Sequence, residues 1–245
     1  MSAFIFMLTQ EDETVTNAES VYESVRTCGL RYVGFKDIGL PKERLATVTK
    51  AAHEDGLEVI LEVVSLSLAD EARSIQIAKQ IGVDWVLGGT YIEAGAKALE
   101  GTGIKYCPFI GEVVGHPSLL HGTVGELASL ALQTTSHAGV YGLDLLAYRH
   151  TDENPTEVIR RVIAKSQGPV IVAGSISTPQ QIALISAAGA WGFTIGSAIF
   201  NRLMPGGLDV PDQVAWVVKY AASLNADSNG MGFIGRGISA APIDE

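Results

Sequence analysis

The chain has 245 residues, of which 47% are hydrophobic and 18% are charged, and its formal net charge is −10. This composition is typical of a globular protein with a large core and excludes an intrinsically disordered chain. The sequence contains no cluster of Lys and Arg, so nucleic acid is not an expected partner. No apolar run is long enough to cross a membrane, and the first residues lack the basic and apolar regions of a signal peptide. We therefore expect a cytoplasmic protein without a membrane partner.

Short apolar segments rich in β-branched residues alternate along the chain with segments of helical periodicity. Strands are predicted over residues 3–9, 30–35, 57–64, 83–87, 104–110, 140–147, 170–173 and 191–195. Helices are predicted over residues 16–28, 41–56, 67–81, 94–99, 180–188 and 210–224, and two more begin at Thr123 and Asn154. Thr123 is followed by Glu126 at the spacing of a capping box. A long loop is predicted over residues 111–122.

Eight strand–helix units in regular succession predict an α/β fold, namely a single (β/α)8 TIM barrel. The barrel is expected to occupy residues 1–225, because no linker interrupts the alternation. Residues 226–245 are rich in Gly, Ser and Ala and are predicted to form a C-terminal tail.

Two Gly-Ser turns follow the last two predicted strands. Gly174 and Ser175 end the first of these strands, and Gly196 and Ser197 end the second and open a short helical segment. In a parallel barrel both turns lie at the same mouth. Glycine lets an anion approach the backbone N–H groups, and a helix N-terminus favours negative charge. The four residues therefore predict a cup for a phosphate dianion, with a small phosphorylated metabolite as the partner.

The same segment resembles the last two βα units of the phosphate-binding TIM barrels, which include the ribulose-phosphate-binding barrels and the sugar-phosphate isomerases and epimerases. The matching motifs are V-A-G-S-I, T-P-x-Q and G-A-W-G-F-T-I-G-S-A-I. The N-acetylmannosamine-6-phosphate epimerases carry a carboxylate where this chain has Gly174 and Ser175, and their catalytic lysine lies on the third strand. In this chain Glu62 lies on the third predicted strand and Lys36 on the second. The resemblance therefore does not imply the mechanism of those epimerases.

Strand alternation predicts which side chains point into the barrel. It places Lys36 and Glu62 inward on adjacent strands, both near the carboxyl ends, and it places Asp144, Leu146 and Tyr148 inward on the sixth strand. Lys36, Glu62 and Asp144 are the predicted catalytic residues, because charged groups at such strand ends are costly to bury unless they pair or are used. A purely structural ion pair is the alternative.

Polar residues in the predicted loops are candidate substrate contacts. Glu112 and His116 lie in the loop 111–122, and Tyr148 and Arg149 follow the sixth strand. Carboxylate and imidazole groups suit several divalent ions, so a divalent metal near Glu112, His116 and His121 is considered. The residues lack the spacing of a dense ligand motif, and neither a metal site nor an organic cofactor is predicted.

Three functional hypotheses follow. The first is a cofactor-independent isomerase or epimerase of a small phosphorylated sugar or sugar acid, in which Glu62 or Asp144 takes a proton next to a carbonyl and Lys36 stabilises the enediolate oxygen. The second is a lyase, either a decarboxylase or an aldolase, since F-K-D-I-G-L-P resembles a segment of the orotidine-phosphate decarboxylases and Lys36 could form a Schiff base. The third is a non-catalytic barrel that binds a phosphometabolite. Barrels of this type commonly associate, so a homo-oligomer is considered.

Overall fold

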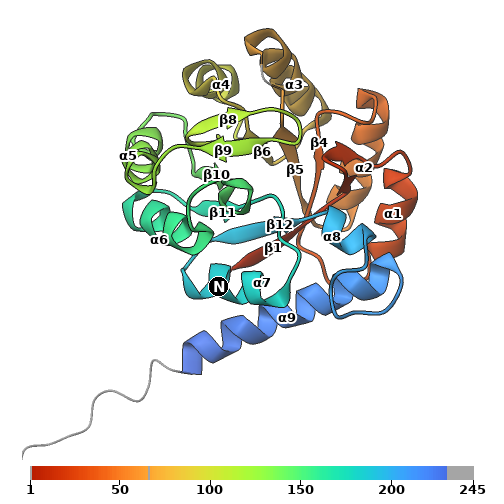
Figure 1. Cartoon of the computed structure of the whole chain (residues 1–245). Coiled ribbons are helices and arrows are strands. Elements are labelled where there is room, and N and C mark those ends of the chain that lie inside the picture. Colours follow the sequence, from red (N-terminus) through yellow and green to blue (C-terminus); the bar gives the residue numbers. More distant parts are fainter. Residues whose placement is uncertain (1, 66, 231–245) are drawn as a thin grey trace, which may run out of the picture.

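The computed structural model describes residues 2–65 and 67–230, with backbone only for residues 225 and 227–230. Eight parallel strands form one sheet in the order β10-β11-β12-β1-β4-β5-β6-β7 (Figure 1). Their bounds are β1 Ala3–Met7, β4 Tyr32–Lys36, β5 Glu58–Val63, β6 Trp85–Gly88, β7 Lys105–Cys107, β10 Leu143–Leu145, β11 Val170–Val172 and β12 Gly192–Ile195. A parallel bridge between Phe109 and Asp144 joins the two edges of the sheet. The predicted barrel is confirmed.

Helices alternate with the strands and surround the barrel (Figure 1). They are α1 Ala18–Val25, α2 Lys42–Glu54, α3 Leu68–Ile81, α4 Ile92–Leu99, α5 Val124–Thr135, α6 Pro155–Lys165, α7 Pro179–Ala187, α8 Ser197–Phe200 and α9 Val210–Gly230. None of the helices in the described part of the chain is both long and apolar enough to span a bilayer.

Two separate apolar clusters show how the strands alternate. Inside the barrel lie Ile5, Met7, Tyr32, Ile60, Trp85, Leu87, Cys107 and Ile171. The intervening residues, such as Val33 and Phe35 on β4, pack in a larger cluster with the helices. Lys36 and Glu62 have the same parity as the interior residues Tyr32 and Ile60, so both belong to the inward face.

Three segments before the C-terminal helix differ from the sequence prediction. The predicted loop 111–122 contains an antiparallel hairpin, β8 Glu112–Val114 with β9 Leu119–His121. The sixth strand ends at Leu145 and continues into the 3-10 helix η1, Ala147–Arg149, so Leu146 and Tyr148 pack with the outer cluster instead of pointing inward. A further hairpin, β2 Thr9–Gln10 with β3 Glu13–Thr14, follows the first strand.

The C-terminal helix is also longer than the sequence predicts. It was expected to end near Leu224, but α9 continues to Gly230, so the first five residues of the predicted tail are helical. Residues 231–245 of that tail lie outside the described part of the chain.

Side-chain caps fix the starts of two helices next to strand ends. The capping box predicted at Thr123 and Glu126 is confirmed at α5. A second box begins α7, where Thr178 accepts from the Gln181 N–H and the Gln181 side chain accepts from the Thr178 N–H. Gln181 also accepts from the Ser177 N–H and donates to the Ser175 carbonyl. The cap therefore holds the loop that follows β11.

Replacement of Thr178 by alanine should lower the free energy of unfolding by about 1 kcal/mol, because the N-terminal N–H groups of α7 lose an acceptor. Thr178→Ser keeps the hydroxyl and is the matched control. Urea unfolding of the three proteins measures the difference, and equal stability of Thr178→Ala and Thr178→Ser would contradict the capping role.

Candidate functional site

Lys36 and Glu62 meet at the carboxyl ends of neighbouring strands. They are register partners on β4 and β5, and Lys36 Nζ lies 3.6 Å from Glu62 Oε1. Both side chains are buried. The sequence predicts this adjacency, because both residues occupy inward positions at the same height of the barrel.

Asp12 is the member of this cluster that the sequence analysis missed. Asp12 Oδ1 accepts hydrogen bonds from Lys36 Nζ at 2.5 Å and from Arg149 Nη2 at 2.7 Å. Asp12 Oδ2 accepts a third hydrogen bond, from Arg149 Nη1 at 3.1 Å. The Asp12 side chain is only 2% exposed. A sequence signal was present, since Asp12 lies among three consecutive acidic residues directly after the first strand.

The charge state of Asp12 follows from its partners. Burial acts to raise the pKa of Asp12, but the hydrogen bonds from Arg149 and the charges of Lys36 and Arg149 outweigh it and hold the pKa well below the usual range. Asp12 is therefore a carboxylate throughout the physiological pH range. The Arg149 guanidinium that binds it is also partly buried, at 15% side-chain exposure.

The two Gly-Ser turns lie together beside this cluster. Gly174 and Ser175 both have positive φ, at 75° and 56°, which directs the backbone after β11 around the cup. Gly196 precedes α8, and a Cβ atom there would stand 2.6 Å from the Thr9 carbonyl oxygen, so only glycine fits. Ser197 begins α8. Backbone N–H groups at such turns are suited to phosphate oxygens.

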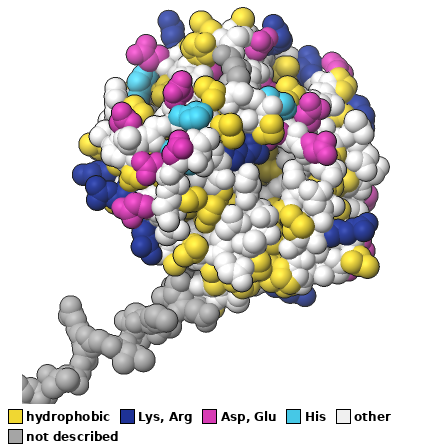
Figure 2. All heavy atoms as spheres, viewed as in Figure 1, with side chains coloured by type: hydrophobic (Ala, Val, Ile, Leu, Met, Phe, Trp, Pro, Cys, Tyr) yellow, Lys and Arg dark blue, Asp and Glu magenta, His cyan; other side chains and the backbone are white. Residues whose placement is uncertain are grey.

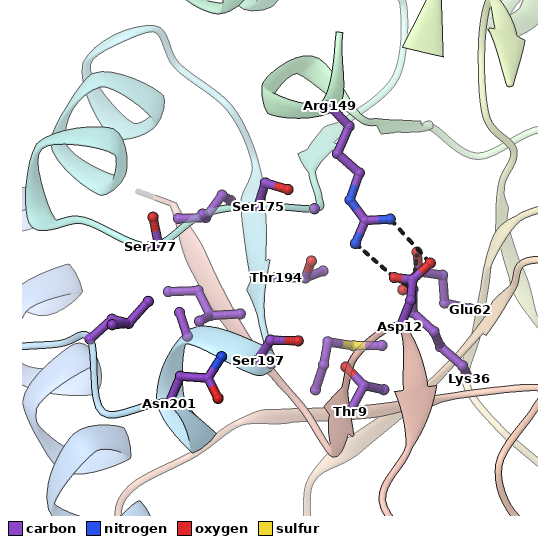
Figure 3. A pocket seen from close by; sticks show the side chains of 17 residues that line it. Thr9, Asp12, Lys36, Glu62, Arg149, Ser175, Ser177, Thr194, Ser197 and Asn201 are labelled. Carbon is purple, nitrogen blue, oxygen red and sulfur yellow. Dashed lines mark hydrogen bonds and ion pairs between the residues drawn. The ribbon is translucent and has the colours of Figure 1, made fainter. Parts of the chain in front are cut away.

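One cavity of about 280 Å³ contains both groups of residues. Its lining includes the charged residues Asp12, Lys36, Glu62 and Arg149, and the turn residues Gly174, Ser175, Ser177, Gly196, Ser197 and Asn201. In Figure 3 the charged residues gather on one side, Ser175 and Ser197 lie on the other, and Arg149 reaches down between them toward Asp12. The volume is at the low end for ligand pockets, which suits a small metabolite.

Arg149 connects the two ends of the cavity. Its side chain packs against Gly174, where a Cβ atom would overlap the Arg149 guanidinium and its methylene groups. Its Nη1 and Nη2 atoms donate to Asp12. A phosphate in the cup would therefore have a buried guanidinium at its edge.

Asp144 lies deeper and does not line the cavity. It is fully buried, and neither carboxylate oxygen has a hydrogen-bond partner in the described structure. Burial, followed by the charge of Glu62, raises the pKa of Asp144 well above its usual range. This direction favours a neutral carboxylic acid, which cannot act as the proton acceptor considered for it in the sequence analysis.

The remaining predicted substrate contacts are scattered. His116 is near the charged cluster, with Nδ1 3.7 Å from Asp12 Oδ2, but it does not line the cavity. Glu112 lies on β8 beside a separate groove shared with His121, and Tyr148 packs among the outer apolar residues. Among the side chains that the structure describes, no three His, Cys, Asp or Glu groups form a metal-binding cluster.

Comparison with known proteins gives one curated relative and many similar folds. No protein-family model matches the chain. Over 197 residues the chain is 28% identical to the PdxS subunit of pyridoxal 5′-phosphate synthase from Corynebacterium glutamicum, and the match covers 77% of this chain and 57% of that relative. The chain thus spans little more than half the length of the curated relative.

Two solved structures illustrate the fold. A (S)-3-O-geranylgeranylglyceryl phosphate synthase from Thermoplasma acidophilum, in complex with sn-glycerol-1-phosphate, superposes with a TM-score of 0.61 at 16% identity over 91% of this chain and 94% of that one. A phosphoribosylanthranilate isomerase from Thermotoga maritima gives 0.61 at 17% identity over 91% and 100% of the two chains. The chain therefore has the fold of the phosphate-binding TIM barrels, as its sequence predicts.

Replacement of Asp144 by asparagine should remove a pH-dependent loss of stability. Because the native-state pKa of Asp144 is raised above the ordinary value of about 3.9, the wild-type protein loses stability as the pH rises from that value toward the raised one. Asparagine does not ionise, so the free energy of unfolding of Asp144→Asn relative to wild type should increase with pH. Urea unfolding between about pH 4.5 and 8 measures this slope.

The matched control is Asp152→Asn, which makes the same chemical substitution at an exposed residue. It should change stability by a similar amount at every pH in this range. If the difference in free energy of unfolding between Asp144→Asn and wild type also stayed constant with pH, a neutral Asp144 in the native state would be contradicted.

Proposed function

We propose that the protein is an enzyme of a small phosphorylated metabolite, whose phosphate occupies the cup at Gly174, Ser175, Gly196 and Ser197. The observation that carries this proposal is the single cavity lined by both the Gly-Ser turns and the buried charged residues. A ligand held by its phosphate at one end would place its other end beside Lys36 and Glu62. This separation of binding and chemistry is typical of barrels that act on phosphorylated substrates.

The names of similar proteins support this substrate class. The curated relative is a subunit of pyridoxal 5′-phosphate synthase, and one structural neighbour holds sn-glycerol-1-phosphate as its substrate. A phosphoribosylanthranilate isomerase has the same fold. Each of these proteins is named for a phosphorylated compound.

The reaction we propose is proton transfer next to a carbonyl, as in an isomerase or epimerase, without an organic cofactor. Glu62 takes the proton from the carbon next to the carbonyl, and the electron pair moves to the carbonyl oxygen. The Lys36 ammonium stabilises that oxygen. In an isomerase Glu62 then returns the proton to the former carbonyl carbon on the same face, while the proton of the neighbouring hydroxyl moves to the other enediolate oxygen; in an epimerase a water molecule protonates the original carbon from the opposite face, and Glu62 keeps the proton until solvent removes it. Lys36 Nζ donates to Asp12 and lies 3.6 Å from Glu62 Oε1, so the two carboxylates hold it beside the proposed base.

A lyase that forms a Schiff base is the second candidate. It is favoured by the position of Lys36, the one lysine among the residues that line the described cavity. An amine nucleophile needs a free lone pair directed at the carbonyl carbon, whereas Lys36 Nζ is engaged by Asp12 and lies beside Glu62. Borohydride reduction in the presence of each phosphorylated compound separates the candidates, because only a Schiff base leaves a covalent adduct on Lys36.

Ser197→Asp should abolish the preference for phosphorylated ligands, because its carboxylate would repel a phosphate in the cup. Ser197→Asn is similar in size and uncharged, and it should retain most of the preference. Gly196 is avoided because any side chain there would overlap Thr9. The measurement is the melting temperature with D-ribose 5-phosphate, with D-ribose, and with inorganic phosphate.

A phosphorylated ligand at about 100 times its Kd should raise the melting temperature of the wild-type protein by roughly 5–10 °C. D-ribose should give no comparable shift. Equal shifts with D-ribose and its phosphate, or an undiminished phosphate effect in Ser197→Asp, would contradict the cup.

Glu62→Gln should slow proton exchange at the carbon next to the carbonyl by about 10²–10⁴-fold, because the amide cannot accept the proton. The protein is incubated in deuterium oxide with D-ribulose 5-phosphate, D-ribose 5-phosphate and dihydroxyacetone phosphate, and loss of the carbon-bound proton is followed by NMR. Glu58→Gln, near the opposite end of the same strand, is the control. Exchange that is unaffected by Glu62→Gln would exclude Glu62 as the base.

A further inference from the structure

The hairpin β2–β3 turns through two residues that are strained in their backbone. Glu11 and Asp12 have φ values of 50° and 70°. Two-residue turns of this kind favour Asn and Gly, because other residues rarely adopt positive φ. Strain of this kind persists where surrounding contacts hold the residue in place, and it clusters at functional sites.

Contacts on both sides fix this turn within the site. Toward the phosphate cup, the Glu11 N–H donates to Ser197 Oγ at 3.2 Å and Gln10 Nε2 donates to Asn201 Oδ1 at 3.0 Å. Toward the charged end, Thr14 Oγ1 accepts from the Lys36 N–H and donates to the Lys36 carbonyl. The hairpin thus connects α8 with β4, and the Asp12 side chain lies between them.

Asp12 holds together two cations that would otherwise repel one another. Its Oδ1 accepts from both Lys36 and Arg149, and its Oδ2 accepts from Arg149. These bonds engage both carboxylate oxygens, which leaves Asp12 a poor proton acceptor for a substrate. The lysine side chain has several rotatable bonds. The hydrogen bond to Asp12 therefore keeps the Lys36 ammonium at one point in the cavity.

We propose that Asp12 is a positioning residue, which fixes the Lys36 ammonium and the Arg149 guanidinium relative to the phosphate cup. It acts through these two side chains and does not itself contact the reacting atoms. The proposal rests on the proposed function, but the arrangement it describes can be tested without a substrate. The low pKa of Asp12 agrees with this role, since the carboxylate persists over the whole working pH range.

Asp12→Asn tests the proposal. Asparagine has nearly the same shape and tolerates positive φ, so the variant removes the charge with little change to the turn. Each lysine is acetylated with limiting acetic anhydride, and its rate is read by peptide mass spectrometry. Lys36 should react faster than in the wild type by on the order of tenfold, because its ammonium loses a buried carboxylate. Lys105, which pairs with Glu58 in another part of the barrel, should be unchanged.

Glu13→Gln is the matched control, since it removes an exposed carboxylate from the residue next to Asp12. It should leave the Lys36 rate as in the wild type. Wild-type reactivity of Lys36 in folded Asp12→Asn would overturn the proposal. Faster acetylation of every lysine would indicate that Asp12→Asn is unfolded. In that case the Lys36 acetylation rate is measured in Asp12→Glu, which keeps the carboxylate but moves it away from its position in the wild type. Wild-type Lys36 reactivity in folded Asp12→Glu would likewise overturn the proposal.

A second readout separates positioning from binding. In the deuterium-exchange assay with D-ribulose 5-phosphate, Asp12→Asn should lower the rate at saturation by on the order of tenfold or more, and by a larger factor than the affinity for inorganic phosphate, to which Arg149 contributes only from the edge of the cup. A parallel loss of phosphate affinity and rate would contradict positioning. Failure of the proposed function gives a different result, namely no phosphate preference and no exchange in the wild type, while the Lys36 acetylation pattern still changes in Asp12→Asn.

Discussion

The arrangement of the site depends on a balance of buried charge at the barrel mouth. Two cations, Lys36 and Arg149, lie against two carboxylates, Asp12 and Glu62. An unpaired charge in such a place costs several kcal/mol, so each group depends on the others. Asp144 would add a fifth charge below this cluster, and burial together with Glu62 raises its pKa instead. The mouth of the barrel thus contains one carboxyl group whose pKa is held low, Asp12, and another whose pKa is raised, Asp144.

The proposed phosphate ligand is compatible with an acidic protein. The formal net charge of −10 would disfavour a phosphate at long range, but the cavity is lined by the two Gly-Ser turns, and the half-buried Arg149 side chain packs against Gly174. Figure 2 shows acidic and histidine side chains on both sides of the mouth, with few charged side chains over α7.

The sequence predicts the barrel and much of the cavity, because both depend on local periodicity. Alternation along two strands places Lys36 beside Glu62, and the paired Gly-Ser turns end neighbouring strands of the same mouth. Asp12 was missed because it enters the site through a hairpin turn with positive φ at two non-glycine residues, which no periodic pattern indicates. Tyr148 was misplaced because the strand ends at Leu145 and a 3-10 helix changes the direction of the following side chains. The hairpin within residues 111–122 was missed because each of its strands has only three residues, too few to show a periodic pattern, and the strands form only by pairing with each other.

A crystal structure of the protein soaked with D-ribulose 5-phosphate would show directly where the phosphate binds. We predict that the phosphate accepts from backbone N–H groups at residues 174–175 and 196–197, with the carbonyl end of the ligand beside Lys36 and Glu62. A phosphate bound elsewhere on the molecule would contradict the proposed cup. The cup would also be contradicted by a reversed ligand, with its phosphate between Lys36 and Arg149 and its carbonyl end in the cup.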